Sequence, residues 1–479
     1  MKSVKNNVVY NTIFQILTLA IPLLSTPYIA RVLGAESVGK YSFSLSMTTY
    51  FTIFAVMGSS VYGQRLIAFS RDDKPSLNSN FWNIFSFRLI SCCIALGFYF
   101  LYLFLTNNLT LLNVIVSLNI LNVAVDVTWF FSGLEEFKIT IVRGMLVKIV
   151  GYACIFIFVR NCSDTWKYAL ILLGTTVLGN LALCRVLPNY VNRPKKVEPF
   201  INIKGMFLVF LPTIATQVYM VLDKTMIGLI TNSDYFNGCY EQSEKVVRAI
   251  LIPLTAVSSV VLPRVANLYK RNALEQAKQY IYKAYRVIWA LALPCMFGLI
   301  AIASVFIPLY LGPNYEMSID LLKIFAILAF VVAPASITGL AYLVPTNQQN
   351  VYTIAVTSAA IVNFGLNILL IRNYGAYGAA IASVIAESIG TCIQITYCVI
   401  TKQLVLKDIF KYFNRYLFFS IIMFCVIIFI KQNIAVSIYS LVLLIGTGGL
   451  CYILLLLVTR DELVMSVISS VKKIVLHKA

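Results

Sequence analysis

The chain has very little charge and almost no histidine. Only 12% of its 479 residues are Asp, Glu, Lys or Arg, about half the share found in soluble proteins. Its single histidine is His477, near the C-terminus, so a histidine-based triad or zinc site within the membrane is excluded. The 11 cysteines are scattered and form no C-x-x-C pair, which leaves no redox or zinc motif to interpret. Long polar segments are missing too, so the chain has no room for a separate catalytic domain.

Hydrophobic sequence takes the place of these features from end to end. Hydrophobic residues make up 60% of the chain, and the mean hydropathy is +0.85. A helix needs roughly 20 apolar residues to cross a bilayer, and this pattern predicts an all-α polytopic membrane protein with about 14 transmembrane helices. The predicted spans lie near Tyr10–Arg31, Val38–Gln64, Phe81–Leu105, Leu109–Phe131, Arg143–Val159, Lys167–Arg185, Met206–Ile230, Phe236–Leu262, Val287–Pro308, Ile319–Val344, Tyr352–Ile371, Tyr377–Ile400, Tyr412–Ile430 and Ala435–Val458.

Basic residues outnumber acidic ones, 38 against 19, which gives a net charge of +19. They are spread along the chain instead of forming one patch, a distribution that argues against nucleic-acid binding. With the N-terminus in the cytoplasm, about 27 of them fall in inward segments and about 6 in outward ones, a strong positive-inside bias. This bias predicts cytoplasmic termini at both ends and an even number of spans. The first apolar stretch lacks a cleavage site and reads as a signal anchor.

Charge and hydropathy predict four parts. An N-terminal lobe of six spans covers 1–187, a basic cytoplasmic linker covers 188–204, and a C-terminal lobe of six spans covers 205–401. Residues 402–479 hold spans 13 and 14 and a basic cytoplasmic tail. A second charged segment, Arg264–Arg286, mixes basic residues with tyrosines. It favours an amphipathic helix at the lipid surface, either a solvated connector or a site for anionic lipid.

The two lobes show a modest internal repeat. Gly39-Lys40-Tyr41 and Gly238-Cys239-Tyr240 open spans two and eight, at nearly the same distance after Pro22 and Pro212. A parallel duplication relates two halves by an axis along the membrane normal, and such repeat interfaces commonly hold a transporter's substrate. Spans 13 and 14 have no counterpart and look like an addition.

Several charged residues fall inside the predicted spans, where each costs at least about 2.5 kcal/mol and needs a partner, a wet cavity or a function. Span eight carries two pairs four residues apart, Glu241 with Lys245 and Glu244 with Arg248, in the favourable helical order. Mutual neutralisation and a polar stripe lining protein or water both remain open. The other charged residues expected near the bilayer centre are Arg88, Asp126, Asp223, Lys224 and Glu387, whereas Lys323 and Arg31 lie close enough to a span end to snorkel.

Asp126 lies among aromatic residues in span four, close to Trp129 and Phe130. It is either an acid satisfied by its packing or part of a proton- or ion-linked gate. Basic residues in both halves indicate a central cavity of positive potential, whose low-dielectric walls would focus the field on an anionic ligand. Arginine suits phosphate because its planar fork holds two oxygens at once. The sequence therefore favours a phosphate-bearing polar headgroup as the ligand.

Four motifs resemble those of a known family, the Wzx-type polysaccharide flippases of the multidrug/oligosaccharidyl-lipid/polysaccharide (MOP) transporter superfamily. The first is close to R-x-L-G-x(4)-G-x-Y, the second to D-x-x-W-x-F-x-G-x-E, and the others match the paired signatures of spans seven and eight. The likeness covers essentially the whole chain, and the motifs are specific jointly more than singly. They lie at Arg31–Tyr41, Asp126–Glu135, Asp223–Gly228 and Tyr240–Lys245.

The resemblance implies a bacterial flippase of the cytoplasmic membrane. Such a protein moves an undecaprenyl-pyrophosphate-linked oligosaccharide repeat unit to the outer leaflet, for capsule, O-antigen or other cell-surface polysaccharide. It implies two six-helix lobes around a cationic cavity, resembling multidrug exporters of the MATE type. It also implies the lipid bilayer as surroundings, no resident cofactor, and a polysaccharide polymerase and assembly proteins as partners.

Within that hypothesis, alternating access carries the headgroup across while the polyprenyl tail stays in lipid. Burying sugar and phosphate in hydrocarbon without partners costs several kcal/mol for each polar group. We expect the pyrophosphate and sugars to bind at Arg31, Arg88, Lys224 and Arg248. Coupling to a proton or sodium gradient remains open, with candidates for coupling or gating at Asp126, Asp223, Glu241, Glu244 and Glu387.

Two other functions compete with this hypothesis. A multidrug exporter of the related branch would have a more acidic or apolar cavity, which the buried basic residues disfavour. A membrane glycan polymerase or ligase needs a sizeable outward loop for its acceptor, whereas outward connections here are as short as 106–108. A scaffold fits least, because buried charge serves no packing purpose.

Overall fold

The computed structural model describes residues 2–192, 194, 196–466 and 469, with side chains from Ile21 onward except at 212, 213, 215 and 216. About 85% of the residues are helical, and the described part contains no strand. Helices are expected because a membrane offers backbone groups no water, so each span must satisfy its own N–H and C=O groups. The predicted all-α class is confirmed.

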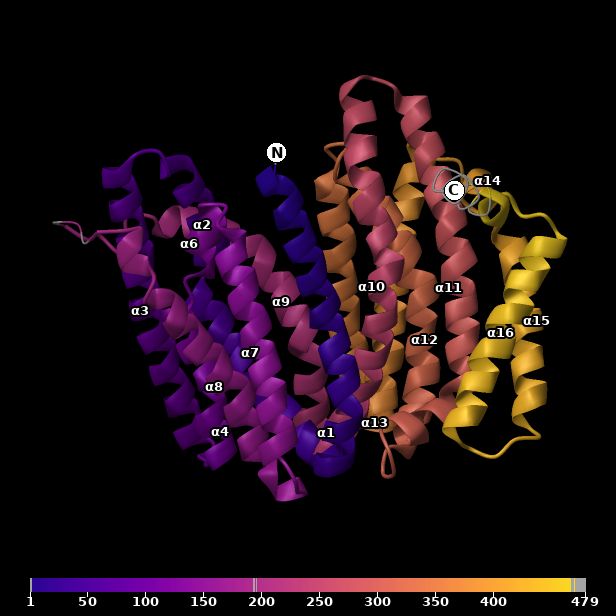
Figure 1. Cartoon of the computed structure of the whole chain (residues 1–479), viewed down its shortest axis with the longest axis horizontal. Helices are drawn as coiled ribbons and strands as arrows, with labels where there is room; N and C mark the ends of the chain where they lie inside the picture. The colour runs from indigo at the N-terminus through magenta and orange to yellow at the C-terminus, as the bar shows by residue number, and fades with distance from the viewer. Residues whose placement is uncertain (1, 193, 195, 467–468, 470–479) are drawn as a thin grey trace. The chain divides into compact units, whose positions relative to one another are not determined.

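The chain divides into two compact units, unit 1 (Met1–Gly238) and unit 2 (Cys239–Ala479). Figure 1 colours unit 1 from indigo to magenta and unit 2 from rose to yellow. The helices that begin in unit 1 are α1 Lys2–Val56, α2 Ser59–Ser70, α3 Lys74–Leu105, α4 Leu111–Val116, α5 Leu118–Val125, α6 Thr128–Gly133, α7 Phe137–Phe158, η1 Cys162–Asp164, α8 Thr165–Cys184, η2 Leu187–Asn189, α9 Ile203–Thr231 and α10 Asp234–Lys270. Those of unit 2 are α11 Leu274–Tyr310, α12 Glu316–Ser336, η3 Ile337–Leu343, α13 Gln349–Ile400, α14 Leu406–Ile409, α15 Phe413–Lys431 and α16 Ile438–Val458.

Two of these helices contain a sharp turn at a glycine. Gly34 in α1 has φ 75° and ψ 169°, and Gly375 in α13 has φ 54° and ψ −133°. Only glycine adopts such angles readily, so each helix consists of two segments that meet at the glycine. Ten helices of the described part are long and apolar enough to cross a membrane. If the two segments of α13 are counted separately and the two segments of α1 and α9 are added, the described helices are roughly consistent with the predicted count of about 14 spans.

The fourth span is not one helix, contrary to our expectation for Leu109–Phe131. It is divided into α4, α5 and α6, and Asp126 adopts an extended conformation (φ −76°, ψ 110°) where α5 ends. Span two is interrupted as well, at Gly58, whose φ is 71°. The apolar pattern did not reveal either break, because it assigns the residues on both sides to one continuous span, Val38–Gln64 or Leu109–Phe131.

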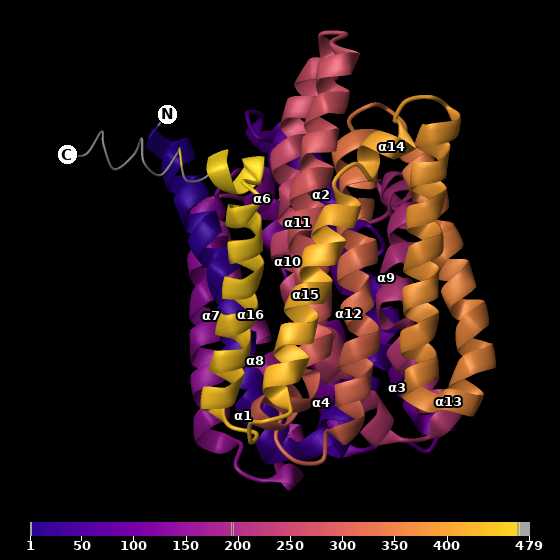
Figure 2. The same ribbon diagram turned by 90° about the vertical axis from the view of Figure 1, so that its right-hand side faces the viewer.

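The segment Arg264–Arg286 does not lie along the lipid surface as one amphipathic helix. Its first residues continue α10 and most of the rest begin α11, with a turn between the two helices near Asn272 (φ 54°). Each helix has 37 residues, about 55 Å at 1.5 Å per residue, whereas the hydrocarbon is about 30 Å thick. The α10–α11 hairpin projects beyond the other helices of unit 2 (Figures 1 and 2).

The C-terminal helices α15 and α16 pack against α11 within unit 2 (Figure 2). At one end of this contact Asp461, which is 0% exposed, accepts hydrogen bonds from Arg286 Nη2 at 3.1 Å and Tyr416 Oη at 3.2 Å. Arg415 Nη1 lies 3.3 Å from the same carboxylate. At the other end Lys431 Nζ donates to the carbonyl of Ala301 at 3.0 Å. We call Arg286, Arg415, Tyr416 and Asp461 the C-terminal latch.

Candidate functional site

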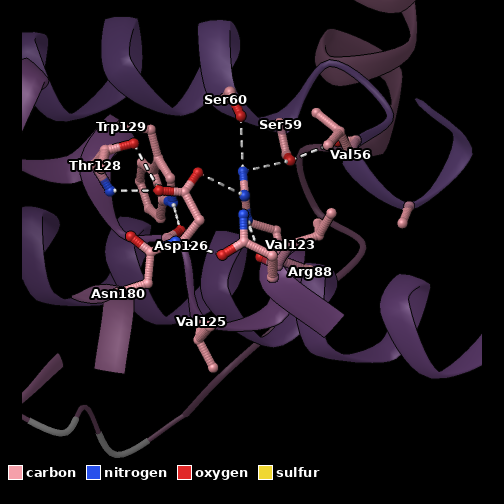
Figure 3. Close-up of polar contacts among 12 residues, drawn as sticks. Val56, Ser59, Ser60, Arg88, Val123, Val125, Asp126, Thr128, Trp129 and Asn180 are labelled. Atoms are coloured by element: carbon pink, nitrogen blue, oxygen red, sulfur yellow. Dashed lines mark hydrogen bonds and ion pairs between the residues drawn. The ribbon is translucent and has the colours of Figure 1, made fainter. Parts of the chain in front are cut away.

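Arg88 of α3 is the most deeply buried cation in the described part of unit 1, with 1% of its surface exposed. Its guanidinium contacts both interrupted spans (Figure 3). Nη1 donates to Ser60 Oγ at 2.8 Å and to Ser59 Oγ at 3.2 Å, at the start of α2. Nη2 lies 3.2 Å from Asp126 Oδ2, and Nε donates to the carbonyl of Val123 at 3.0 Å. One side chain therefore joins the breaks of spans two and four.

Asp126, the acidic partner of Arg88, also stabilises the break in span four through hydrogen bonds at the start of α6. Its Oδ1 accepts hydrogen bonds from the backbone N–H of Thr128 at 3.0 Å and from Thr128 Oγ1 at 2.6 Å. Trp129 Nε1 donates to the backbone carbonyl of Asp126 at 3.1 Å. Carboxylates stabilise helix starts because they accept from N–H groups that lack a helical partner. Asp126 thus serves the start of α6 and the charge of Arg88 together (Figure 3).

The carbonyls left open by the breaks receive donors from neighbouring helices. A helix end leaves its last carbonyls without a next-turn N–H, and an unmet polar group is costly in a membrane. Ser91 Oγ donates to the carbonyl of Ala55 at 2.7 Å, ahead of Gly58. The thiol of Cys184 lies 3.3 Å from the carbonyl of Val125. The local sequence folds this way because α3 and α8 supply the missing donors.

Arg143 of α7 is a member of this cluster that the sequence did not single out. Its position in the sequence places it among the cytoplasmic basic residues, yet the structure half-buries it within the charge field of Asp126. Its buried Nε and Nη2 have no hydrogen-bond partner among the described residues. Arg143 thus offers two donors to an incoming anion. Its position at the edge of a predicted span was the only sequence signal.

The two charged pairs of span eight form in the structure, as expected if the acids and bases neutralise one another. Lys245 Nζ lies 2.8 Å from Glu241, and Arg248 contacts Glu244 Oε1 through Nε at 2.8 Å. Both cations keep about half of their side-chain surface exposed, whereas both acids are largely buried. The acids are therefore neutralised and the cations stay accessible.

The other predicted residues lie on α1 and α9 of unit 1 and on α13 of unit 2. Arg31 is an exposed residue of α1, just before the turn at Gly34. Asp223 and Lys224 are half-buried in α9 of unit 1, and Glu387 is half-buried in α13 of unit 2. Among the described residues, no group of three His, Cys, Asp or Glu side chains could hold a metal ion.

The repeated glycines meet within unit 1. A Cβ on Gly39 would lie 1.7 Å from the carbonyl oxygen of Asp234, and a Cβ on Gly238 would lie 1.9 Å from the carbonyl oxygen of Ala35. The backbone of α1 after Gly34 and the first turn of α10 are therefore in direct contact. The sequence shows both glycines as a repeat, but it gives no sign that they pack against each other.

Comparisons with known proteins agree with this architecture. The profile of the family described as polysaccharide biosynthesis protein matches residues 4–269, more than half of the chain. An Escherichia coli K12 protein named as an O-antigen transporter is 22% identical over 84% of this chain and 98% of its own length. A Haloferax volcanii protein named as a low-salt glycan biosynthesis flippase is 23% identical over 39% of each chain.

Solved structures share the fold. The lipid II flippase MurJ in an inward closed conformation superposes with a TM-score of 0.77, at 14% identity, over 95% of this chain and 100% of that one. An inward-facing MATE multidrug transporter of the MOP superfamily superposes with a TM-score of 0.58, at 15% identity, over 82% and 97%. At these identities the likeness establishes the MurJ/MATE-like fold and leaves the substrate to other arguments.

Proposed function

Because the chain belongs to the polysaccharide biosynthesis protein family, we propose that this multipass membrane protein is a transporter, a flippase for lipid-linked glycans, and not an enzyme. The finer proposal is that it moves undecaprenyl-pyrophosphate-linked oligosaccharide repeat units from the cytoplasmic to the outer leaflet. Relatives named for O-antigen transport and for a glycan biosynthesis flippase support this substrate class. The MurJ-like fold supports it too.

The observation that carries the proposal is the set of cations kept available inside spanning helices. Arg248 and Lys245 remain half-exposed although their acids are buried, and Arg143 keeps buried donors without a described partner. Such cations are costly in hydrocarbon and are retained for a purpose. A diphosphate can approach the exposed part of these cations, and its oxygens match the arginine fork.

In this proposal the diphosphate and first sugars bind at Arg31, Lys224 and Arg248. Arg88 is assigned a positioning role, because its guanidinium is already used by Ser59, Ser60 and Asp126. It holds the breaks of spans two and four in place, and Arg143 takes over the direct contact with phosphate in unit 1. The polyprenyl tail stays in the lipid throughout.

Alternating access completes the proposal. Gly39 approaches the first turn of α10 closely, and in this proposal that contact lies toward the outer side and closes it during one stage of the cycle. When α1 and α10 separate at this contact and the cytoplasmic side closes, the headgroup is released outside. Coupling to protons or sodium ions, if the protein uses it, runs through Asp223, Glu241, Glu244 or Glu387. Asp126 is less suited to this role, because Arg88 and Thr128 already hold both of its oxygens.

The test is transport by the purified protein in liposomes. Fluorescent lipid-linked oligosaccharide is placed in both leaflets, and a membrane-impermeant quencher or periodate reports how fast the inner pool reaches the outside. Protein-dependent movement of the diphosphate-linked glycan, with no movement of a cationic dye, is the expected result. Dye transport without glycan transport would support the multidrug exporter instead. Joining of repeat units without net movement would support a polymerase.

A further inference from the structure

A polar cavity of about 250 Å³ lies in unit 1 beside the outer glycine contact. Its walls come from α1, the end of α3, the connection that follows it and the start of α10. None of the residues that line the cavity belongs to the Arg88 cluster or to the cations assigned to the diphosphate. Besides Tyr99 and Asn113, whose hydrogen bonds are described below, the polar lining residues are Lys40, Ser44, Tyr102, Asn108, Thr110 and Asp234.

The cavity wall is fixed by hydrogen bonds before any ligand arrives. Tyr99 Oη donates to the carbonyl of Asn113 at 3.0 Å, and Asn113 Nδ2 donates to the carbonyl of Asn108 at 2.8 Å. The backbone N–H of Asn113 donates to Thr110 Oγ1, the cap of α4, at 3.3 Å. These bonds occupy the connection's own backbone and leave the Asn108 side chain facing the cavity. A preformed wall lowers the entropic cost of binding.

The groups left open are those that recognise a sugar. Tyr102 presents an aromatic ring, and its hydroxyl makes no hydrogen bond to any residue that the structure describes. Asn108 supplies a donor and an acceptor, Lys40 a donor and Asp234 an acceptor, so vicinal hydroxyl groups would find complementary partners. Asp234 lies within the charge field of Lys40. The wall thus offers no net charge to attract a phosphate.

The size and position of the cavity narrow the ligand further. Pockets for drug-sized ligands are about 300–1,000 Å³, so this cavity suits one sugar residue and not a whole repeat unit. Lys40 and Asp234 flank the contact where a Cβ on Gly39 would strike the Asp234 carbonyl. The positive-inside bias places this end of the spans on the outer face. A ligand here would touch both segments that must separate for release.

We propose that this cavity is an exit subsite that binds one neutral sugar residue of the glycan at the outer face. The identity of the ligand rests on the proposed flippase function, whereas the cavity itself does not. By holding a sugar against the ring of Tyr102, between Lys40 and Asp234, as the headgroup leaves, the subsite favours departure to the outside over return. It acts on the sugar, apart from the cations that act on the diphosphate.

The test combines sidedness with occupancy. Asn108→Cys is introduced in a Cys162→Ser background, because Cys162 is an exposed thiol of an outward connection. Right-side-out membrane vesicles are treated with an impermeant maleimide, alone or with N-acetylglucosamine, N-acetylgalactosamine, galactose, glucose or rhamnose. At ten times its Kd a sugar slows labelling about 11-fold. Tyr439→Cys, at a position of α16 that is 88% exposed, is the matched control.

We expect the thiol introduced by Asn108→Cys to react from outside and at least one sugar to protect it. The thiol introduced by Tyr439→Cys should not be protected by any sugar, and sorbitol should protect neither. Adding Tyr102→Ala to Asn108→Cys should abolish protection, and adding Tyr102→Phe, which keeps the ring, should weaken it.

Three results would overturn the proposal. The thiol of Asn108→Cys could react only after permeabilisation, no sugar could protect it, or Tyr102→Ala could leave protection unchanged. Glycan flipping is measured on the same variants. If the protein flips glycan but no sugar protects the thiol, the subsite proposal alone is wrong. If a sugar protects the thiol but no glycan is flipped, the proposed flippase function is wrong.

Discussion

Arg88 and Asp126 illustrate how a buried ion pair differs from an exposed one. Arg88 has four acceptors around it, and Asp126 supplies the only charge among these four. Removing one partner of a buried pair leaves an uncompensated charge and costs about 3–5 kcal/mol. We therefore expect Asp126→Asn to lower the free energy of unfolding by about that amount. Thermal denaturation of the purified protein in nanodiscs, without substrate, measures it.

An exposed pair within the same unit is the control. Arg71 lies 3.2 Å from Glu135, with both side chains exposed, and such pairs contribute about 0–1 kcal/mol. Glu135→Gln should therefore leave the melting temperature nearly unchanged. In the double variant Arg88→Met, Asp126→Asn the loss should be smaller than the sum of the single losses. Equal and additive losses would mean that the two residues do not act as a pair.

The sequence identified both Arg88 and Asp126 as charged residues within spans, but it did not predict that they form an ion pair. A charge inside an apolar span is visible in the sequence because its cost is general. The pairing is not visible, because it depends on breaks at Gly58 and Asp126 that bring α3 against the ends of two other helices. Arg143 escaped notice for a related reason. Asp126, whose charge acts on Arg143, lies at that same break, in a different span.

At the level of elements, the contact between α1 and α10 depends on two missing side chains. Each Cβ would meet backbone, at 1.7 Å for Gly39 and at 1.9 Å for Gly238, and backbone cannot move aside as a flexible side chain can. Overpacking of this kind costs about 1–3 kcal/mol. We expect Gly39→Ala and Gly238→Ala each to destabilise the protein by that amount and to slow flipping.

The control for these variants is Gly97→Ala in α3, where no atom lies within 4 Å of the added Cβ. Alanine favours a helix over glycine by about 1 kcal/mol, so this variant should be as stable as the parent protein or more so. Thermal melts and the flipping assay compare all three. Normal flipping by Gly39→Ala would contradict the role of this contact in closing the outer side.

The C-terminal latch gives a second prediction about elements. Asp461 is the common acceptor of Arg286, Arg415 and Tyr416, so its loss frees α15 and α16 from α11 at one end. We expect Asp461→Asn to increase cleavage of the connections around α15 and α16 by added protease severalfold, because opening by about 1.4 kcal/mol raises the open fraction tenfold. The neighbouring Glu462→Gln should change it little, since Glu462 is exposed. Equal cleavage of both variants would contradict the latch.

The hydropathy pattern predicts where apolar helices lie, but it does not predict where they break or how far they extend beyond the membrane. The approximate number of spans follows from hydropathy, as do the connections between Arg31 and Val38 and between Ile371 and Tyr377, where the structure turns at Gly34 and Gly375. The division of span four and the straight continuation of α10 beyond Leu262 do not. Span four is divided by contacts from other helices, whereas α10 continues to Lys270 although the sequence turns from apolar to charged after Leu262.

For the whole molecule, the proposed function predicts that the cations assigned to the diphosphate act on the substrate and not on folding. Lys224→Glu replaces one positive charge of α9 by a negative one, which should repel a diphosphate. We expect flipping of the lipid-linked glycan to fall at least tenfold, a change of about 1.4 kcal/mol, while the melting temperature stays within a few degrees. Lys204→Glu, at the exposed start of α9, is the control. An unchanged flipping rate in Lys224→Glu would remove this residue from the site.

The charge of the substrate gives the last prediction, which concerns the whole transport cycle. A diphosphate carries negative charge outward, and each elementary charge gains about 2.3 kcal/mol per 100 mV when the inside is negative. In liposomes that contain potassium, valinomycin should therefore speed movement of the diphosphate-linked glycan from the inner to the outer leaflet, and a reversed potassium gradient should slow it. A glycolipid with a neutral linkage is the control. If the potential affects neither substrate, counter-ions must neutralise the diphosphate, and the same assay with a proton or sodium gradient then shows which ion moves with it.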